Sequence, residues 1–155
     1  MAALNFPSSP SVNDTYTANS VTYTWNGESW LATGVNVVES FVVACSDLTT
    51  ALTAGTNKFS WRMPYAFVPT EVFGELRTAQ TSGSIFTADL NEGGTSILST
   101  KITIDNGETD SDAAVAAVVI SDTLLARRAL MSVDFDQVGD GTAKGFILTI
   151  VGRRP

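Results

Sequence analysis

The sequence predicts an all-β protein, an antiparallel β-sandwich or jelly roll preceded by a small three-stranded N-terminal meander. Charged residues make up only 16% of the chain, while Thr, Ser, Gly and Ala are plentiful, which suits strands joined by turns. Apolar and polar residues alternate in several segments, as in Phe59-Ser60-Trp61-Arg62-Met63, where the odd positions are apolar. Turn signals such as Gly139-Asp140-Gly141 recur at regular intervals, as in sandwiches and jelly rolls.

The length of 155 residues fits one ordinary domain with a small appendage. We expect residues 1–36 to form an N-terminal arm and aromatic meander that serves for attachment. Residues 37–155 are expected to form a jelly-roll-like knob domain, and 44% apolar residues suffice for a full core. Proline, serine and glycine punctuate both sides of the appendage, in Pro7-Ser8-Ser9-Pro10-Ser11 and in Thr33-Gly34-Val35-Asn36.

The predicted meander has strands at residues 15–18, 21–25 and 29–32. Asn26-Gly27 separates the second strand from the third and predicts a type I′ hairpin turn, because both residues tolerate positive φ. Three short strands bury little surface by themselves. We therefore expect the meander to dock on another surface through its aromatic side chains.

From residue 37 onward the pattern predicts about eight strands. Residues 146–151 form a nearly continuous apolar run, which predicts a central strand covered on both faces. Residues 47–54 and 121–128 are expected to form short helical turns. The predicted strand segments are 37–45, 57–62, 70–79, 84–91, 96–99, 101–105, 114–120, then after a break 130–138, and 143–152.

Composition argues against several classes of function. The formal net charge of −7 disfavours nucleic acid, which is bound through clustered Lys and Arg. No apolar run approaches the length of a membrane span, and the start shows no signal-peptide pattern. We therefore expect no membrane partner and synthesis in a cytoplasm. The single cysteine, Cys45, follows an apolar run and is expected to be a buried small hydrophobic residue.

Catalysis and metal binding are both disfavoured. The chain has no histidine, so the commonest general base near neutral pH is missing. Asp134 and Asp136 point to one face of a strand, as a hydrolytic carboxylate pair or simply as the solvated face of a sandwich. Together with Asp140 they offer oxygen ligands for calcium, but the spacing does not match an EF-hand loop. We therefore expect no enzyme activity, no cofactor and no metal site.

Aromatic residues are the candidate partner-binding residues. Two predictions stand for Trp25 and Trp30: they stack on a glycan or contact a partner subunit, or else they form a local core within the meander. Partner contact is favoured because the meander is too small to hide both rings. Phe59 and Trp61 are expected in the core of the main domain. The predicted partner-binding set is Phe6, Tyr16, Tyr23, Trp25, Trp30 and Tyr65, the last of these on an irregular loop around Pro64.

Two parts of the chain resemble modules of tailed-phage virions. NFPSSPSVNDTYT (5–17) and VTYTWNGESW (21–30) are similar to a short module of tail-fibre and other virion-surface proteins, especially of phages that infect cyanobacteria and marine bacteria. The remainder resembles a domain found at the exposed end of such proteins. Its matching stretches are ACSD (44–47), TALTAGT (50–56), RMPYAF (62–67), TAQTSGSIFT (78–87), NEGGTSILSTK (91–101) and DFDQVGDGTAKG (134–145).

The resemblance implies a structural protein on the virion surface with no chemistry of its own. Its expected partners are other copies of itself, as a homotrimer, and phage capsid or tail proteins. A long shaft between the two modules is absent, which favours a capsid decoration or cement protein, or a head fibre. The alternative is a tail-fibre tip that binds a receptor or a host surface glycan.

Overall fold

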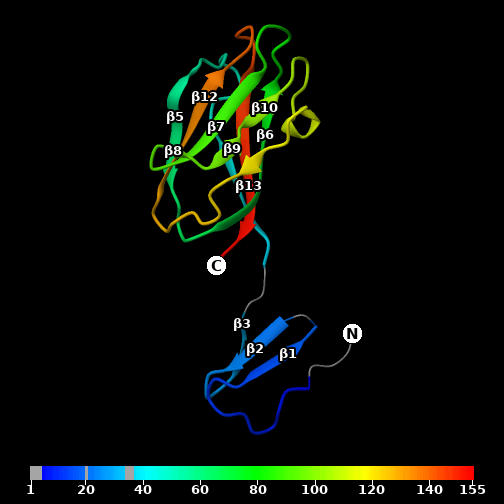
Figure 1. Cartoon of the computed structure of the whole chain (residues 1–155), viewed down its shortest axis with the longest axis vertical. Helices are drawn as coiled ribbons and strands as arrows, with labels where there is room; N and C mark the ends of the chain where they lie inside the picture. Colours follow the sequence, from blue (N-terminus) through cyan, green and yellow to red (C-terminus); the bar gives the residue numbers. More distant parts are fainter. Residues whose placement is uncertain (1–4, 20, 34–36) are drawn as a thin grey trace. The chain divides into compact units, whose positions relative to one another are not determined.

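The computed structural model describes residues 5–19, 21–33 and 37–155, and these residues form an all-β protein. The chain divides into two compact units, Met1–Val37 and Val38–Pro155, each drawn in Figure 1. Neighbouring strands pair in antiparallel fashion in both units. The predicted fold class is confirmed.

The first unit is a three-stranded meander in the order β1-β2-β3. Its strands are β1 (Thr15–Ala18), β2 (Val21–Trp25) and β3 (Trp30–Thr33). The predicted type I′ turn at Asn26-Gly27 is wrong, because Gly27 has φ +104° while Asn26 is not left-handed. Four residues connect the strands instead. The Oδ1 atom of Asn26 accepts the backbone N–H groups of Glu28 at 2.9 Å and Ser29 at 2.8 Å, which closes the loop from its side chain.

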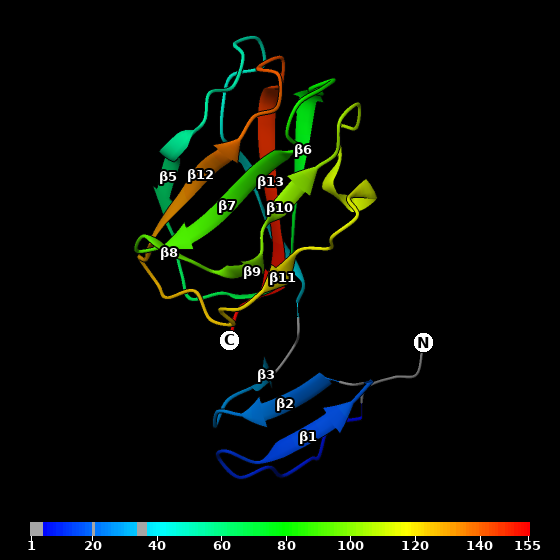
Figure 2. The same cartoon turned by 45° about the horizontal axis from the view of Figure 1, so that its top comes forward.

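The second unit packs two main sheets face to face (Figure 2). One sheet has the order β4-β13-β6 and the other β10-β7-β12-β5, with β8 added beside β7 and a small β11-β9 pair. These sheet orders do not establish jelly-roll connectivity, which stays a prediction. The strands are β4 (Glu39–Ala44), β5 (Gly55–Arg62), β6 (Val68–Thr78), β7 (Phe86–Glu92), β8 (Thr95–Ser96), β9 (Leu98–Thr100), β10 (Ile102–Ile104), β11 (Val119–Ile120), β12 (Leu130–Gln137) and β13 (Lys144–Arg153).

The core lies between these two sheets and follows the alternation in the sequence. Every second residue of β7, β12 and β13 points inward and is almost completely buried. Phe86, Phe135 and Phe146 meet at its centre, with ring centroids 5.1 to 5.5 Å apart. The inward residues of these strands are Phe86, Ala88, Leu90, Met131, Val133, Phe135, Phe146, Leu148 and Ile150.

Two predictions about apolar segments are wrong. β13 is the central strand of its sheet, but only one of its faces is buried, and Ile147 and Val151 on the other face are half-buried. The apolar segment 114–120 forms a strand only at Val119–Ile120, after the short 3-10 helix η1 (Ser111–Ala113). The sequence predicted a strand over the whole segment, but most of it is an exposed connection.

The two expected helical turns are also absent, because aspartate side chains close these segments differently. The Oδ1 atom of Asp47 accepts the N–H groups of Thr49 at 2.7 Å and Thr50 at 2.6 Å. The Oδ1 atom of Asp122 accepts the N–H of Leu124 at 3.0 Å. Such side-chain bonds compete with a helical backbone.

Candidate functional site

The structure brings five of the six predicted partner-binding residues together in the first unit. The ring of Phe6 lies among three others, with centroids 5.2 Å from Tyr16, 5.0 Å from Tyr23 and 5.4 Å from Trp30, on which it stacks at 15°. Trp30 in turn lies 5.6 Å from Trp25. We call these five residues the aromatic cluster.

Strand pairing explains why four of these rings share one face of the meander. Tyr23 and Trp25 are two residues apart on β2 and therefore point to the same side. Antiparallel register places Tyr16 opposite Tyr23, and Trp30 opposite Trp25. Cross-strand neighbours of this kind lie close enough for their rings to interact.

The N-terminal arm carries the fifth ring, and backbone hydrogen bonds tie the end of the arm to β2. The N–H of Asn13 donates to the carbonyl of Trp25 at 2.8 Å, and the N–H of Trp25 donates to the carbonyl of Asp14 at 2.9 Å. The N–H of Ser11 donates to the Asp14 carboxylate at 2.8 Å. The arm therefore places Phe6 over the meander.

All five rings of the aromatic cluster are half-buried. None of the residues described in the first unit is fully buried, so this unit has no interior other than the cluster. The cluster is thus a small core, and at the same time an aromatic surface that a partner can reach. The local core that the sequence left open is therefore present, and partner contact by the same side chains stays a prediction.

Tyr65, the sixth predicted partner-binding residue, lies in the second unit. Its hydroxyl donates to Glu39 Oε2 at 2.6 Å, and the Arg154 guanidinium lies 3.8 Å from the centre of its ring. The Tyr65 hydroxyl, together with Arg154, holds the pKa of the Glu39 carboxyl below its usual value. Donating this bond to the Glu39 carboxylate in turn raises the pKa of the Tyr65 hydroxyl. Tyr65 is therefore engaged by residues of its own unit.

No protein-family model, curated protein or solved structure matches the chain.

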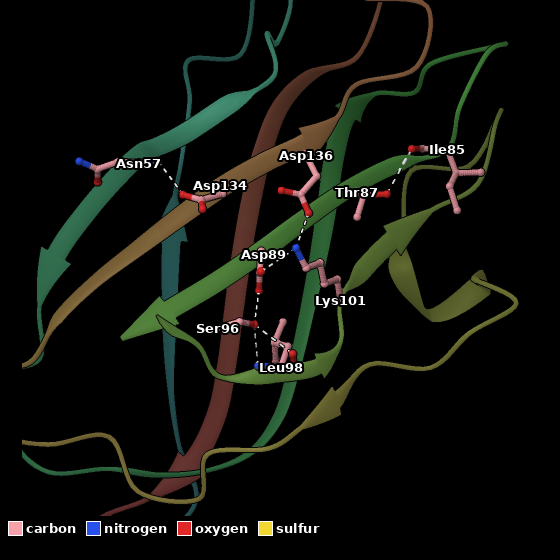
Figure 3. Close-up of polar contacts among 9 residues, drawn as sticks. All are labelled: Asn57, Ile85, Thr87, Asp89, Ser96, Leu98, Lys101, Asp134 and Asp136. Carbon is pink, nitrogen blue, oxygen red and sulfur yellow. Dashed lines mark hydrogen bonds and ion pairs between the residues drawn. The ribbon is translucent and has the colours of Figure 1, made fainter. Parts of the chain in front are cut away.

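A polar group on the outer face of the β10-β7-β12-β5 sheet was missed by sequence reasoning (Figure 3). Lys101 Nζ lies 2.8 Å from Asp89 Oδ2 and 2.6 Å from Asp136 Oδ2. Ser96 donates its hydroxyl to Asp89 Oδ1 at 2.6 Å. Asp89 is only 5% exposed and lies in β7, whose other residues are mostly buried. A charged residue within this apolar segment was the sequence signal that could have identified the group.

The chemistry of this group is that of a structural ion pair. Hydrogen bonds to Asp136 and Asp89 raise the pKa of Lys101 above its ordinary value, so its ammonium stays charged and is no nucleophile. Asp134 and Asp136 do share the outer face of β12, as predicted. However, Asp134 accepts the N–H of Asn57 at 2.6 Å, so each carboxylate already has a structural partner.

The remaining candidate chemical groups are likewise occupied. Asp140 accepts hydrogen bonds from Thr81 and Thr142, which hold its pKa well below the usual range. Within the described residues, no group of three or more Asp, Glu, His or Cys side chains is placed to hold a metal ion. Burial raises the pKa of the Cys45 thiol to about 12. The helices in the described part of the chain include none that is long and apolar enough to span a membrane.

Proposed function

We propose that this chain is a structural protein of the surface of a tailed-phage particle. The first unit attaches it to the particle, and the sandwich unit is displayed as a knob that decorates or stabilises the shell. In this role it is a capsid decoration or cement protein, or a head fibre. The proposal is supported by the two virion-like stretches of sequence and by the character of each unit.

The aromatic cluster is the observation that carries the proposal. None of the described residues of the first unit is fully buried, so this unit gains stability when a partner covers the exposed sides of its five half-buried rings. Trp and Tyr are also the residues most often found at the centre of protein interfaces. Attachment through this unit therefore uses the same side chains that hold it together.

The chemistry of the sandwich supports a role without catalysis. Lys101 is held as a cation, and the carboxylates of Asp89, Asp134 and Asp136 accept hydrogen bonds from fixed neighbours. The thiol of Cys45 is buried and stays protonated at neutral pH. Groups with these partners stabilise a fold rather than activate a substrate.

The test is deletion of residues 1–37 from the protein encoded by an infecting phage, with the protein content of purified virions measured by mass spectrometry. We expect residues 38–155 to fold, because the buried core lies entirely within them. The truncated protein should be absent from particles that otherwise assemble. Truncated protein that still decorates particles would show that attachment does not use the first unit.

A second candidate function is a tail-fibre tip that binds a receptor or a carbohydrate. The observation in its favour is the pair of half-buried indole rings of Trp25 and Trp30, whose centroids lie 5.6 Å apart. Flat aromatic faces of this kind stack on sugars. Copy number separates the two functions, because decoration of a shell requires hundreds of copies and a tail tip only a few. Glycan-array binding by the full-length chain would favour the tip.

A further inference from the structure

A groove lies beside the outer edge of β6, the edge strand of its sheet. Two isolated bridges, Phe67 with Leu125 and Glu75 with Asp110, tie β6 to the connection between β10 and β12. Between these bridges the groove separates the connection from β6, and it has a volume of about 490 Å³. Its apolar lining includes Val72, Phe73, Ala117, Val118, Val119 and Ile120.

The connection that forms the far wall of the groove is apolar and exposed. Residues 113–120 contain no charged side chain, yet Val115 is 96% exposed and Val119 is 48% exposed. Five of these eight residues are exposed, while Val118 and Ile120 are partly buried against the core. Contiguous exposed apolar surface of this kind marks an interaction site.

Carboxylates line part of this groove. Glu71 and Asp112 line it directly and are exposed. Asp110 and Asp122 directly precede the lining residues Ser111 and Thr123 along the same connection. We call this surface the acid-rimmed groove.

A surface of opposite charge lies at the end of β5, which is an edge strand of the other sheet. Arg62, Arg127 and Arg128 are all exposed there, and Arg62 donates to the carbonyl of Arg128 at 2.9 Å. Leu130 lies opposite Arg62 in register and is 43% exposed. Ion pairs in the described part of the chain involve Lys101 and Arg154, so these three arginines have no carboxylate partner. We call this surface the arginine corner.

We propose that copies of this chain bind head to tail, with the arginine corner of one copy seated in the acid-rimmed groove of the next. The chain carries a net charge of −7, so two acid-rimmed grooves repel each other, whereas corner and groove are complementary. β5 and β6 lie on different sides of the sandwich (Figure 2), which leaves each copy with one donor and one acceptor surface. Such a heterologous contact closes into a ring when its rotation allows.

This inference rests on the proposed function and adds further copies of this chain as its partner, but it is tested on the purified full-length chain in the absence of particles. Its failure is therefore distinguishable from a failure of attachment through the first unit. Sedimentation velocity at low ionic strength, up to about 100 µM protein, measures the dissociation constant of the assembly. We expect the wild type to self-associate, and added salt to weaken the contact because it screens the rim charges.

Charge reversal identifies the two surfaces. Arg127→Glu with Arg128→Glu reverses the corner, and Glu71→Lys with Asp112→Lys reverses the groove rim. Each pair alone should raise the dissociation constant roughly 10-fold or more, because it places like charges opposite each other. A chain that carries both pairs has the wild-type net charge and restores the complementarity, so its association should recover toward the wild-type value.

A matched control separates local pairing from net charge. Lys58→Glu with Arg77→Glu changes the net charge as much as the corner reversal does, at exposed residues that lie neither at the corner nor along the groove. Near-UV circular dichroism verifies that every variant is folded. A monomeric wild type overturns the proposal. It is also overturned if the control variant associates as weakly as the corner reversal, or if the folded combined variant does not regain association.

Discussion

Replacing Phe6 with alanine tests whether the arm and the meander form one cooperative unit. The substitution removes the ring around which Tyr16, Tyr23 and Trp30 gather, with centroid distances of 5.0 to 5.4 Å. Phe6 lies outside β1, β2 and β3 and takes no part in their pairing. Any loss of stability therefore comes from the ring contacts that the arm provides.

The magnitude follows from these contacts. An aromatic pair contributes about 0.5–1.5 kcal/mol beyond the area it buries, so three pairs give roughly 1.5–4.5 kcal/mol. Because the Phe6 ring is half-buried, we expect the lower part of this range, about 2 kcal/mol. A meander of three short strands is marginally stable. A loss of this size should leave much of the first unit unfolded at room temperature.

The assay is urea unfolding followed by tryptophan fluorescence in a Trp61→Phe background, where the signal comes only from Trp25 and Trp30. Phe6→Ala should move the fluorescence transition to lower urea or abolish it. Far-UV circular dichroism should show an unchanged transition of the sandwich. Leu31→Ala is the control, because Leu31 is 50% exposed and should change the stability by less than about 0.5 kcal/mol. If Phe6→Ala behaves like Leu31→Ala, the arm does not stabilise the cluster.

Two further predictions concern the sandwich. A β-carbon at Gly74 would lie 2.5 Å from Cε2 of the buried Phe146, so Gly74→Ala should destabilise the unit by roughly 1–3 kcal/mol in urea unfolding. Adding Phe146→Leu should recover part of that loss, and strictly additive costs would contradict the steric cause. The native thiol of Cys45 should react slowly with a disulfide reagent at pH 8, because its pKa of about 12 leaves almost no thiolate, and rapidly once urea unfolds the chain. Fast, complete reaction of the folded protein would contradict its burial.

The sequence predicted the strands well because period-two alternation records a buried face directly. Phe86, Ala88 and Leu90 alternate with Thr87 and Asp89, and this pattern is sufficient to identify β7. Turn chemistry was less decisive. Asn-Gly signals a hairpin at Asn26-Gly27, but the dipeptide does not fix the loop length, and the Asn26 side chain stabilises a four-residue loop. The two-residue hairpin turn with both φ angles positive occurs at Gly93-Gly94 instead.

Contacts between strands that are distant in the chain could not be predicted from the sequence. Lys101 meets Asp89 and Asp136 only because β12 pairs with β7 in a register that places Asp134 opposite Asp89. One sequence does not determine that register. Residues 113–120 show a second limit, because an apolar β-branched run has the same composition whether it lies in a core or at an exposed surface.

The residues proposed for binding contribute differently to stability in the two units. In the sandwich the exposed residues Val115, Arg127 and Arg128 take no part in the core, so binding there can be removed while the fold is kept. In the first unit none of the described residues is fully buried and the aromatic cluster joins the arm to the strands, so a substitution that removes one of its rings also weakens the unit itself. Loss of attachment after Trp30→Ala therefore proves nothing by itself. Only a variant that keeps the cluster folded while its exposed side is changed can separate the two effects, and this requires added bulk at the rim of the cluster rather than removal of a ring.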